Sequence, residues 1–287
     1  MKYFKFLILS ILLLITSGCF KTDNMESINV YTSIYPIQYG IERLYGNHST
    51  INSIYPNDID INKYNLNDKQ ITDYSKSDLF LFNGLSKEKD YAVKMLNKNE
   101  ELKIIDVSLG IEQPQYIEEI WLNPYDYLMI VENIRKGLNE YITNPYLKEE
   151  VNKNYDELKV QISEIDAELK TSIEHSGYKS LLVSSDMFKF LEKYDYNIIS
   201  LEENDNLNEK TINDVKKMIK NGIIKYIYVP NGEKPNNTIQ NLLDNTALEI
   251  IYINKLSTIS DEEVNNKEDY ITITNKNIES FKKELYK

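Results

Sequence analysis

The stretch NPYLKEEVNKNYDELKVQISEIDAELKTSIEH, residues 144–175, decides the architecture of this chain. Asn144 can cap a helix and Pro145 fits the first helical position, so this pair is typical of a helix start. Apolar side chains then recur at steps of three or four, at Leu147, Val151, Tyr155, Leu158, Ile162, Ile165, Leu169 and Ile173. These steps match the helical period. We predict one helix over Asn144–His175, about 45 Å long at roughly 1.5 Å per residue.

The apolar stripe of this helix allows two arrangements. It can pack along two lobes of one chain, or it can pair with a second copy in a coiled coil. We favour packing along two lobes and expect a monomer, and the coiled-coil dimer remains the alternative.

Strands and helices alternate on both sides of the long helix. Before it, strands are predicted over 28–33, 50–55, 79–83 and 102–107, and helices over 36–44, 68–75, 87–96 and 123–141. After it, strands are predicted over 180–184, 198–201, 225–229 and 248–253, and helices over 187–194, 212–221, 237–245 and 275–285. Alternation of this kind is typical of an α/β fold with mainly parallel sheets flanked by helices.

The predicted domain organisation follows from this alternation. An N-terminal lobe covers 28–142, a linker helix 143–176 and a C-terminal lobe 177–287. Ligands of such folds bind beyond the carboxyl ends of the strands. We therefore expect a cleft formed by the loops that follow Tyr55, Val107, Ser184, Val229 and Ile253.

The N-terminus is typical of an export signal. A basic start over 1–5 precedes an apolar run over 6–15, which is shorter than the roughly 20 apolar residues that span a bilayer. Thr16-Ser17-Gly18-Cys19 resembles a bacterial lipobox, with Thr where Leu is usual, which implies that Cys19 takes a lipid. We predict a signal peptide over 1–18 and a tether over 19–27, anchored to the outer face of the cytoplasmic membrane. An ordinary signal peptide beside an unmodified cysteine is the alternative.

Composition excludes several classes of function. The chain has 45 acidic and 33 basic residues and a net charge of −12, so nucleic acid is an unsuitable partner. Cys19 is the only cysteine, so no intrachain disulfide can form. No enzyme signature is present: Ser184-Ser185-Asp186 has no His beside it in the sequence to activate a nucleophile, and there is no Gly-rich phosphate loop.

Several short motifs resemble one protein family. They are Tyr31-Thr32-Ser33-Ile34-Tyr35-Pro36, Ser77-Asp78-Leu79-Phe80-Leu81-Phe82-Asn83-Gly84, Trp121-Leu122-Asn123-Pro124 and Asn277-Ile278-Glu279. Their order and spacing resemble the substrate-binding proteins of zinc and manganese ABC importers. That resemblance implies a lipid-anchored receptor that captures a ligand between two lobes and delivers it to a membrane permease. It also implies that the long helix limits movement of the lobes to small tilts.

The metal ligands of that family are not retained. By the resemblance, the three His positions of the family are Asn62, Glu119 and Ser185 here, and its last acidic ligand falls at or near Asn254. A further Glu of the family falls near Val229. Zinc prefers His nitrogen and Cys thiolate, which this set lacks. Zinc or manganese remains the expectation from the family, although the set is not intact.

The same positions can form a polar cleft without a metal. The candidate cleft residues are Asn62, Tyr64, Glu119, Ser185, Asp186 and Asn254. They could hydrogen-bond a small organic ligand or give a weak site for a hard cation, with Glu119 as the one charged oxygen ligand at a family position. His48 is predicted to be a surface turn residue and His175 a residue at the end of the long helix.

We predict a non-enzymatic, extracytoplasmic substrate-binding lipoprotein of a metal-type ABC importer, whose inherited His site is lost. Its expected partners are an ABC permease, membrane lipid through Cys19 and a small ligand or metal ion. The alternative is a surface adhesin or interaction lipoprotein that keeps the fold without transport.

Overall fold

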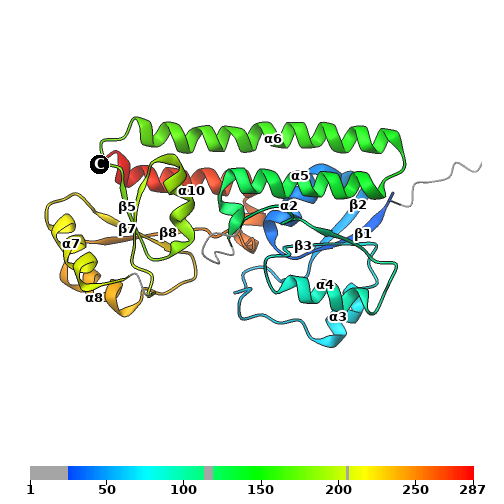
Figure 1. Ribbon diagram of the computed structural model, residues 1–287, viewed down its shortest axis with the longest axis horizontal. Coiled ribbons are helices and arrows are strands. Elements are labelled where there is room, and N and C mark those ends of the chain that lie inside the picture. Colours follow the sequence, from blue (N-terminus) through cyan, green and yellow to red (C-terminus); the bar gives the residue numbers. More distant parts are fainter. Residues whose placement is uncertain (1–24, 113–118, 205–206) are drawn as a thin grey trace, which may run out of the picture.

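The computed structural model describes residues 25–112, 119–204 and 207–287, and Figure 1 shows two lobes beneath one long helix. That helix, α6 (Pro145–Glu174), begins at Asn144, whose side chain accepts a hydrogen bond from Tyr146 N at 2.9 Å. Seven of the eight apolar positions of its stripe are buried, Leu158 completely, and Tyr155 is partly buried. The helix packs on elements of both lobes. The predicted long helix is therefore confirmed, one residue shorter at each end.

The N-terminal lobe has one sheet and four helices. Its strands are β1 (Ile28–Thr32), β2 (Ser49–Ser53), β3 (Leu79–Phe82) and β4 (Lys103–Asp106), and its helices are α2 (Tyr35–Tyr45), α3 (Asp68–Tyr74), α4 (Glu88–Leu96) and α5 (Pro124–Tyr141). Two 3₁₀ turns, η1 (Gly46–His48) and η3 (Ile120–Leu122), complete its described residues. All neighbouring strands are parallel, in the order β2-β1-β3-β4.

The C-terminal lobe repeats this plan. Its strands are β5 (Ser180–Val183), β6 (Asn197–Ser200), β7 (Tyr226–Pro230) and β8 (Glu249–Ile253), and its helices are α7 (Glu209–Lys220), α8 (Asn237–Asn245), α9 (Asp261–Asn265) and α10 (Tyr270–Leu285), with the 3₁₀ helix η4 (Asp186–Tyr194). The parallel order β6-β5-β7-β8 matches that of the first sheet. The predicted fold class, two α/β lobes joined by one long helix, is confirmed.

A second helix, α10, also contacts both lobes. Near its start, the Tyr270 ring stacks on Tyr127 of α5, with ring centroids 3.8 Å apart. Near its end, Phe281 packs edge-on against Tyr228 of β7, at 5.2 Å. One continuous hydrophobic core consequently runs from the first sheet through α6 and α10 to the second lobe, and a smaller core lies under α7 and α8. The lobes thus share buried structure.

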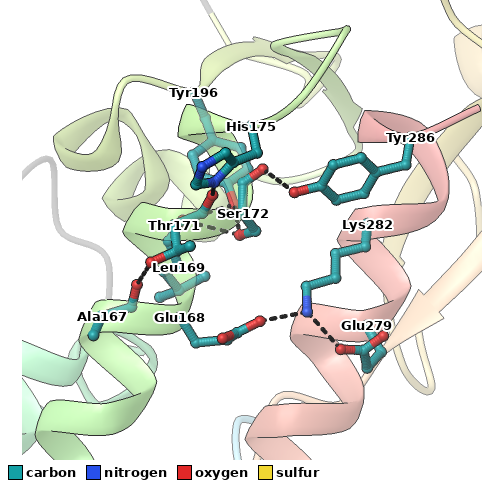
Figure 2. Close-up of polar contacts among 10 residues, drawn as sticks. All are labelled: Ala167, Glu168, Leu169, Thr171, Ser172, His175, Tyr196, Glu279, Lys282 and Tyr286. Carbon is teal, nitrogen blue, oxygen red and sulfur yellow. Dashed lines mark hydrogen bonds and ion pairs between the residues drawn. The ribbon is translucent and has the colours of Figure 1, made fainter.

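Figure 2 shows how the C-terminal end of α6 is joined to α10. Lys282 forms ion pairs with Glu168 of α6 and with Glu279 of its own helix. The Tyr286 hydroxyl donates to the Ser172 carbonyl at 2.7 Å, just beyond the end of α10. His175, as predicted, ends α6, and its Nδ1 lies 3.0 Å from the Thr171 carbonyl oxygen.

Four elements differ from the sequence predictions. α10 begins at Tyr270 rather than Asn275, because Asp269 caps it in a reciprocal pair with Thr272. α7 begins at Glu209 rather than Ile212, after the Asn208 cap. α9 was not predicted, and the predicted helix over 187–194 is a 3₁₀ helix. The other helix and strand ends lie within two residues of their predicted positions.

The predicted signal peptide and Cys19 lie outside the described residues. Met25, near the end of the predicted tether, is buried, and its carbonyl accepts a hydrogen bond from Tyr45 at 2.9 Å. Among the residues that the structure describes, no helix combines the length and apolar character needed to cross a membrane.

Candidate ligand cleft

A cleft of about 780 Å³ opens between the two lobes. It is lined by Asp58, Ile59, Asp60, Ile61, Asn62 and Lys63 from the loop after β2, by Asn231, Gly232, Glu233 and Lys234 after β7, and by Asn254, Lys255, Ser257, Thr258, Ser260 and Glu263 after β8. These loops follow the carboxyl ends of strands from both sheets. Three of the five loops that the sequence analysis assigned to the cleft therefore lie together.

One lysine, Lys87, holds the conformation of the N-lobe loop that follows β2. Lys87 Nζ donates to the backbone carbonyls of Ile61 at 2.5 Å and Tyr64 at 2.6 Å. Asp60 Oδ1 accepts from Asn62 N at 3.1 Å, which closes a tight turn at the cleft edge. The loop conformation thus rests on these hydrogen bonds to backbone groups.

The C-lobe loop is organised by Asn254. Its Oδ1 accepts from Leu256 N at 2.7 Å, and its Nδ2 donates to Glu263 Oε1 at 2.5 Å. Glu263 also accepts from Ser260 N at 2.7 Å and so completes the capping box of α9. Leu256 has a φ of 61°, which the Asn254 side chain supports through this turn. Both polar ends of the Asn254 amide are therefore engaged within the loop.

The base of the cleft is closed by contacts between the lobes. Trp121 Nε1 of the N-lobe donates to the Lys255 carbonyl at 2.7 Å, and Tyr270 donates its hydroxyl to the Trp121 carbonyl at 2.6 Å. Tyr35 N at the start of α2 donates to the Ser257 carbonyl at 3.1 Å. The single tryptophan thus joins the N-lobe to the loop that carries Asn254 and Lys255.

Two ion pairs stand on opposite sides of the cleft. In the N-lobe, Lys63 Nζ lies 2.8 Å from Asp60 Oδ2, and in the C-lobe, Lys255 Nζ lies 3.0 Å from Glu233 Oε1. The hydrogen bond from Lys63 lowers the pKa of Asp60, and Lys255 across the cleft adds to this effect. The hydrogen bond to Asp60 raises the pKa of Lys63, and Glu233 across the cleft adds to it.

The structure brings two of the six candidate residues to this cleft, Asn62 and Asn254. Tyr64 instead packs edge-on against Tyr55, with centroids 5.9 Å apart, and its hydroxyl accepts from Gln70 Nε2 at 2.7 Å. Glu119 is half-buried ahead of η3, where its carbonyl accepts from Leu122 N at 3.1 Å.

Ser185 and Asp186 form a separate polar group at the end of β5. The Ser185 hydroxyl and the Asp186 backbone N–H both donate to Glu202 Oε2. Asp186 Oδ2 accepts from Lys189 at 2.7 Å and from Asn204 at 3.2 Å. The arrangement orders the start of η4. The described residues thus place the third His position of the resemblance in a hydrogen-bond network within its own lobe.

The charged lining residues include the loop residues Asp58, Asp60, Lys63, Glu233, Lys234 and Lys255, none of which is among the six candidate cleft residues. In the sequence they are isolated charges in loops, which are ordinarily solvated surface. The sequence analysis correctly assigned the loop after Tyr55 to the cleft. The position of Asp60 and Lys63 in that loop was the only feature of the sequence that indicated their place at the cleft.

Within the ranges that the structure describes, no group of three or more His, Cys, Asp or Glu residues could hold a metal ion. The described lining of the cleft contains neither His nor Cys. Of the two histidines, His48 pairs with Glu150 at 2.9 Å and His175 ends α6. The polar groups at the cleft are carboxylates, amides, hydroxyls and ammonium groups.

Comparisons with protein families, with curated proteins and with solved structures all point to zinc-binding or zinc-uptake proteins. The family ZnuA, described as the periplasmic component A of a zinc-uptake complex, matches residues 30–284. The zinc-binding protein AdcA of Streptococcus pyogenes serotype M3 is 23% identical over 168 residues, which cover 57% of this chain and 32% of the relative. The chain thus spans about a third of the length of the curated relatives it matches.

Two solved structures have the same fold. The Zn(II)-bound ZnuA-like domain of Streptococcus pneumoniae AdcA superposes with a TM-score of 0.74 at 18% identity, covering 91% of this chain and 100% of that domain. The metal-dependent lipoprotein YcdH of Bacillus subtilis gives a TM-score of 0.75 at 19% identity, covering 90% of this chain and 99% of that one. At these identities the likeness establishes the fold alone.

Proposed function

Because this chain belongs to the ZnuA family of zinc-uptake components, we propose that it is the extracytoplasmic substrate-binding protein of an ABC importer and that its inherited metal site is lost. Proteins of this family are non-enzymatic metal carriers whose partners are an ABC permease and its ATPase. One observation carries the proposal: an interlobe cleft is present, but its described lining has no His or Cys.

The donor set argues against zinc or manganese as a tightly held substrate. Asn62 offers only an amide at one family ligand position, and the Asn254 amide is engaged with Leu256 and Glu263. Lys63 and Lys255 place ammonium groups beside the two carboxylates of the ion pairs, so an incoming divalent cation would meet positive charge. Zinc affinity depends on a complete set of ligands, and this set is incomplete.

Calorimetry with zinc and manganese on the purified protein tests this prediction. We expect no one-to-one complex with submicromolar affinity, because structural zinc sites reach about 10–16 kcal/mol only with a full set of ligands. Glu119→Ala serves as the matched variant, since Glu119 is the charged oxygen ligand at a family position.

A submicromolar zinc complex that weakens in Glu119→Ala would contradict the proposal that the inherited metal site is lost. Ligands from other positions, such as Asp60 or Asp186, would then have replaced the histidines.

The contacts between the lobes support a mechanism in which the loops at the cleft edge, rather than large lobe movements, capture the ligand. α6 and α10 both contact the two lobes, and Trp121 joins them at the base of the cleft. The loops 58–63 and 231–234 carry most of the charged lining residues, and Lys255 and Glu263 are the others. We propose that these loops, with small tilts of the lobes, admit and release the ligand before it passes to the permease. The lobe boundaries 28–142 and 177–287, around the linker 143–176, remain part of this proposal.

Cys19 is proposed as the lipid-bearing residue, although it lies outside the described residues. The basic start, the apolar run and the small residues before this single cysteine support the assignment. Cys19→Ser is expected to release the protein from the membrane fraction or to leave it unprocessed, as fractionation and mass spectrometry would measure. Full retention of a correctly cleaved Cys19→Ser protein would contradict lipid anchoring there.

A surface adhesin or interaction lipoprotein is the second candidate, favoured by the same absence of His and Cys from the described cleft lining. Cross-linking in intact cells followed by mass spectrometry separates the two. An importer component is expected to cross-link to an ABC permease. Cross-links to extracellular proteins, without a permease, would favour the surface role.

A further inference from the structure

The predicted tether ends at a residue that is fixed in the N-lobe. Met25 is completely buried, and its carbonyl oxygen accepts a hydrogen bond from the Tyr45 hydroxyl at 2.9 Å. Only five residues, 20–24, separate Met25 from Cys19 in the sequence. Even a fully extended chain covers at most about 22 Å from Cys19 to Met25, at roughly 3.6 Å per residue. A lipid on Cys19 therefore keeps this part of the N-lobe close to the membrane.

A short series of contacts connects Met25 with the start of α6. The ring centroids of Tyr45 and His48 are 5.2 Å apart. His48 Nε2 in turn lies 2.9 Å from Glu150 Oε2, near the start of α6. Tyr146 precedes Glu150 by four residues and is its neighbour on the helix surface. Figure 1 shows β1 and the connection between α5 and α6 at the end of the N-lobe farthest from the C-lobe, which we call the outer end.

The exposed surface of the outer end is suited to lipid headgroups. The connection 142–146 contains no charged residue, although the whole chain has a net charge of −12. Thr143 and Pro145 are exposed, and Tyr146 is 81% exposed, more than any other large hydrophobic side chain in the part of the protein that the structure describes. A tyrosine ring, apolar with a polar hydroxyl, favours the interface between membrane and water. Tyr146 therefore offers an aromatic contact for headgroups beside an uncharged connection.

The solvent-facing side of α6 is unsuited to the same role. It carries exposed charges, such as the ion pair of Lys153 and Glu157 at 3.8 Å, whose side chains are 75% and 61% exposed. Pressing such a face onto lipid would remove water from the charges, which costs free energy. Contact through the outer end, with α6 directed away from the membrane, is therefore favoured over contact along the length of α6.

We propose that the outer end of the N-lobe rests on the membrane surface, with Tyr146 among the lipid headgroups and α6 directed away from the bilayer. The inference rests on the proposed lipid anchor at Cys19. It also positions the cleft, because the tether joins the amino end of β1, whereas the cleft loop 58–63 follows the carboxyl end of the parallel strand β2. The tether and the cleft thus lie at opposite ends of the first sheet, and the cleft is held away from the lipid.

The test uses the lipidated full-length protein in vesicles of phosphatidylethanolamine and phosphatidylglycerol that contain a lipid with a nitroxide headgroup. Because Cys19 is the only cysteine and its thiol carries the lipid, a single engineered cysteine can be labelled with a fluorophore. The reporters are Glu149→Cys and Lys170→Cys, exposed positions roughly 30 Å apart along α6, and Lys217→Cys on α7. Nitroxides quench only nearby fluorophores, so we expect quenching several-fold stronger at position 149 than at the other two.

Two further changes separate the tyrosine from the tether. Tyr146→Ser is expected to reduce quenching of the Glu149→Cys reporter several-fold. Tyr252→Ser is the matched control, because it removes a ring that is 52% exposed on β8, and it should leave this quenching unchanged. A flexible Gly/Ser segment inserted after Asn24 is also expected to reduce the quenching, because a longer tether lowers the effective concentration of the outer end at the lipid surface.

The inference is overturned if the three reporters are quenched equally, or if Lys217→Cys is quenched most, because the outer end would then not face the membrane. Quenching at position 149 that is unaffected by Tyr146→Ser or by the longer tether would contradict it as well. Mass spectrometry of the same preparation detects the lipid on Cys19. Without that lipid the proposed anchor and this inference both fail, whereas with it a contrary quenching pattern removes this inference alone.

Discussion

At the scale of the residue, Tyr270 connects the lobes through one hydroxyl and one ring. It is 1% exposed, stacks on Tyr127 and donates to the Trp121 carbonyl at 2.6 Å. Tyr270→Phe keeps the stacked ring but leaves that carbonyl without its donor, so we expect a loss of about 1–3 kcal/mol in the free energy of unfolding. Urea unfolding followed by far-UV circular dichroism measures this loss.

Tyr125→Phe is the control for this prediction. Tyr125 is 56% exposed and contacts Lys193 through its ring, with Nζ 4.5 Å from the centroid, which phenylalanine retains. Its effect is expected to stay within about 0.5 kcal/mol. Equal effects of the two substitutions would mean that the Tyr270 hydroxyl does not stabilise the junction.

At the scale of the element, α6 is stabilised by its buried stripe rather than by its exposed face. The side chain of Leu158 is fully buried on the inner face of α6, whereas that of Val160, two residues later, is 58% exposed. Leu158→Ala should cost about 2–5 kcal/mol through lost burial and the cavity it leaves. Val160→Ala should change stability by less than about 0.5 kcal/mol. Chemical denaturation of both variants is the measurement, and similar losses would contradict the assigned packing.

At the scale of the whole molecule, the continuous core predicts cooperative unfolding of both lobes. Buried residues of the N-lobe, α6, α10 and the C-lobe form one cluster. We expect one calorimetric transition and coincident urea midpoints for circular dichroism and for the fluorescence of Trp121, the only tryptophan. Two separate transitions, or a fluorescence midpoint clearly below the other, would show that the lobes unfold independently.

The sequence is more informative about elements than about the cleft. The long helix could be predicted because its stripe keeps one period over eight apolar positions. The early start of α10 was not predicted, because only the local Asp269–Thr272 capping pair marks that boundary.

The cleft depends on contacts between distant segments. Asn62 and Asn254 were placed there by resemblance, and the structure brings both to the same lining. The opposition of Asp60 and Lys63 to Glu233 and Lys255 has no counterpart in the sequence, because charged loop residues are usually solvated and their partners are set by the tertiary fold. The contact of Ser185 could not be predicted either, because its hydrogen-bond partner Glu202 is brought to it only by the tertiary fold.

The position of α10 has a consequence for the order in which the molecule can be assembled. The N-lobe needs Tyr270 beside Tyr127, yet Trp121 and its partner Tyr270 are 149 residues apart in the chain. During synthesis the first lobe therefore has an incomplete interior until nearly the whole polypeptide exists. Contacts of such long range form late and slowly. For a member of an extracytoplasmic family, an N-lobe whose interior is completed late is compatible with export, because a polypeptide threads through a translocation pore in an unfolded form.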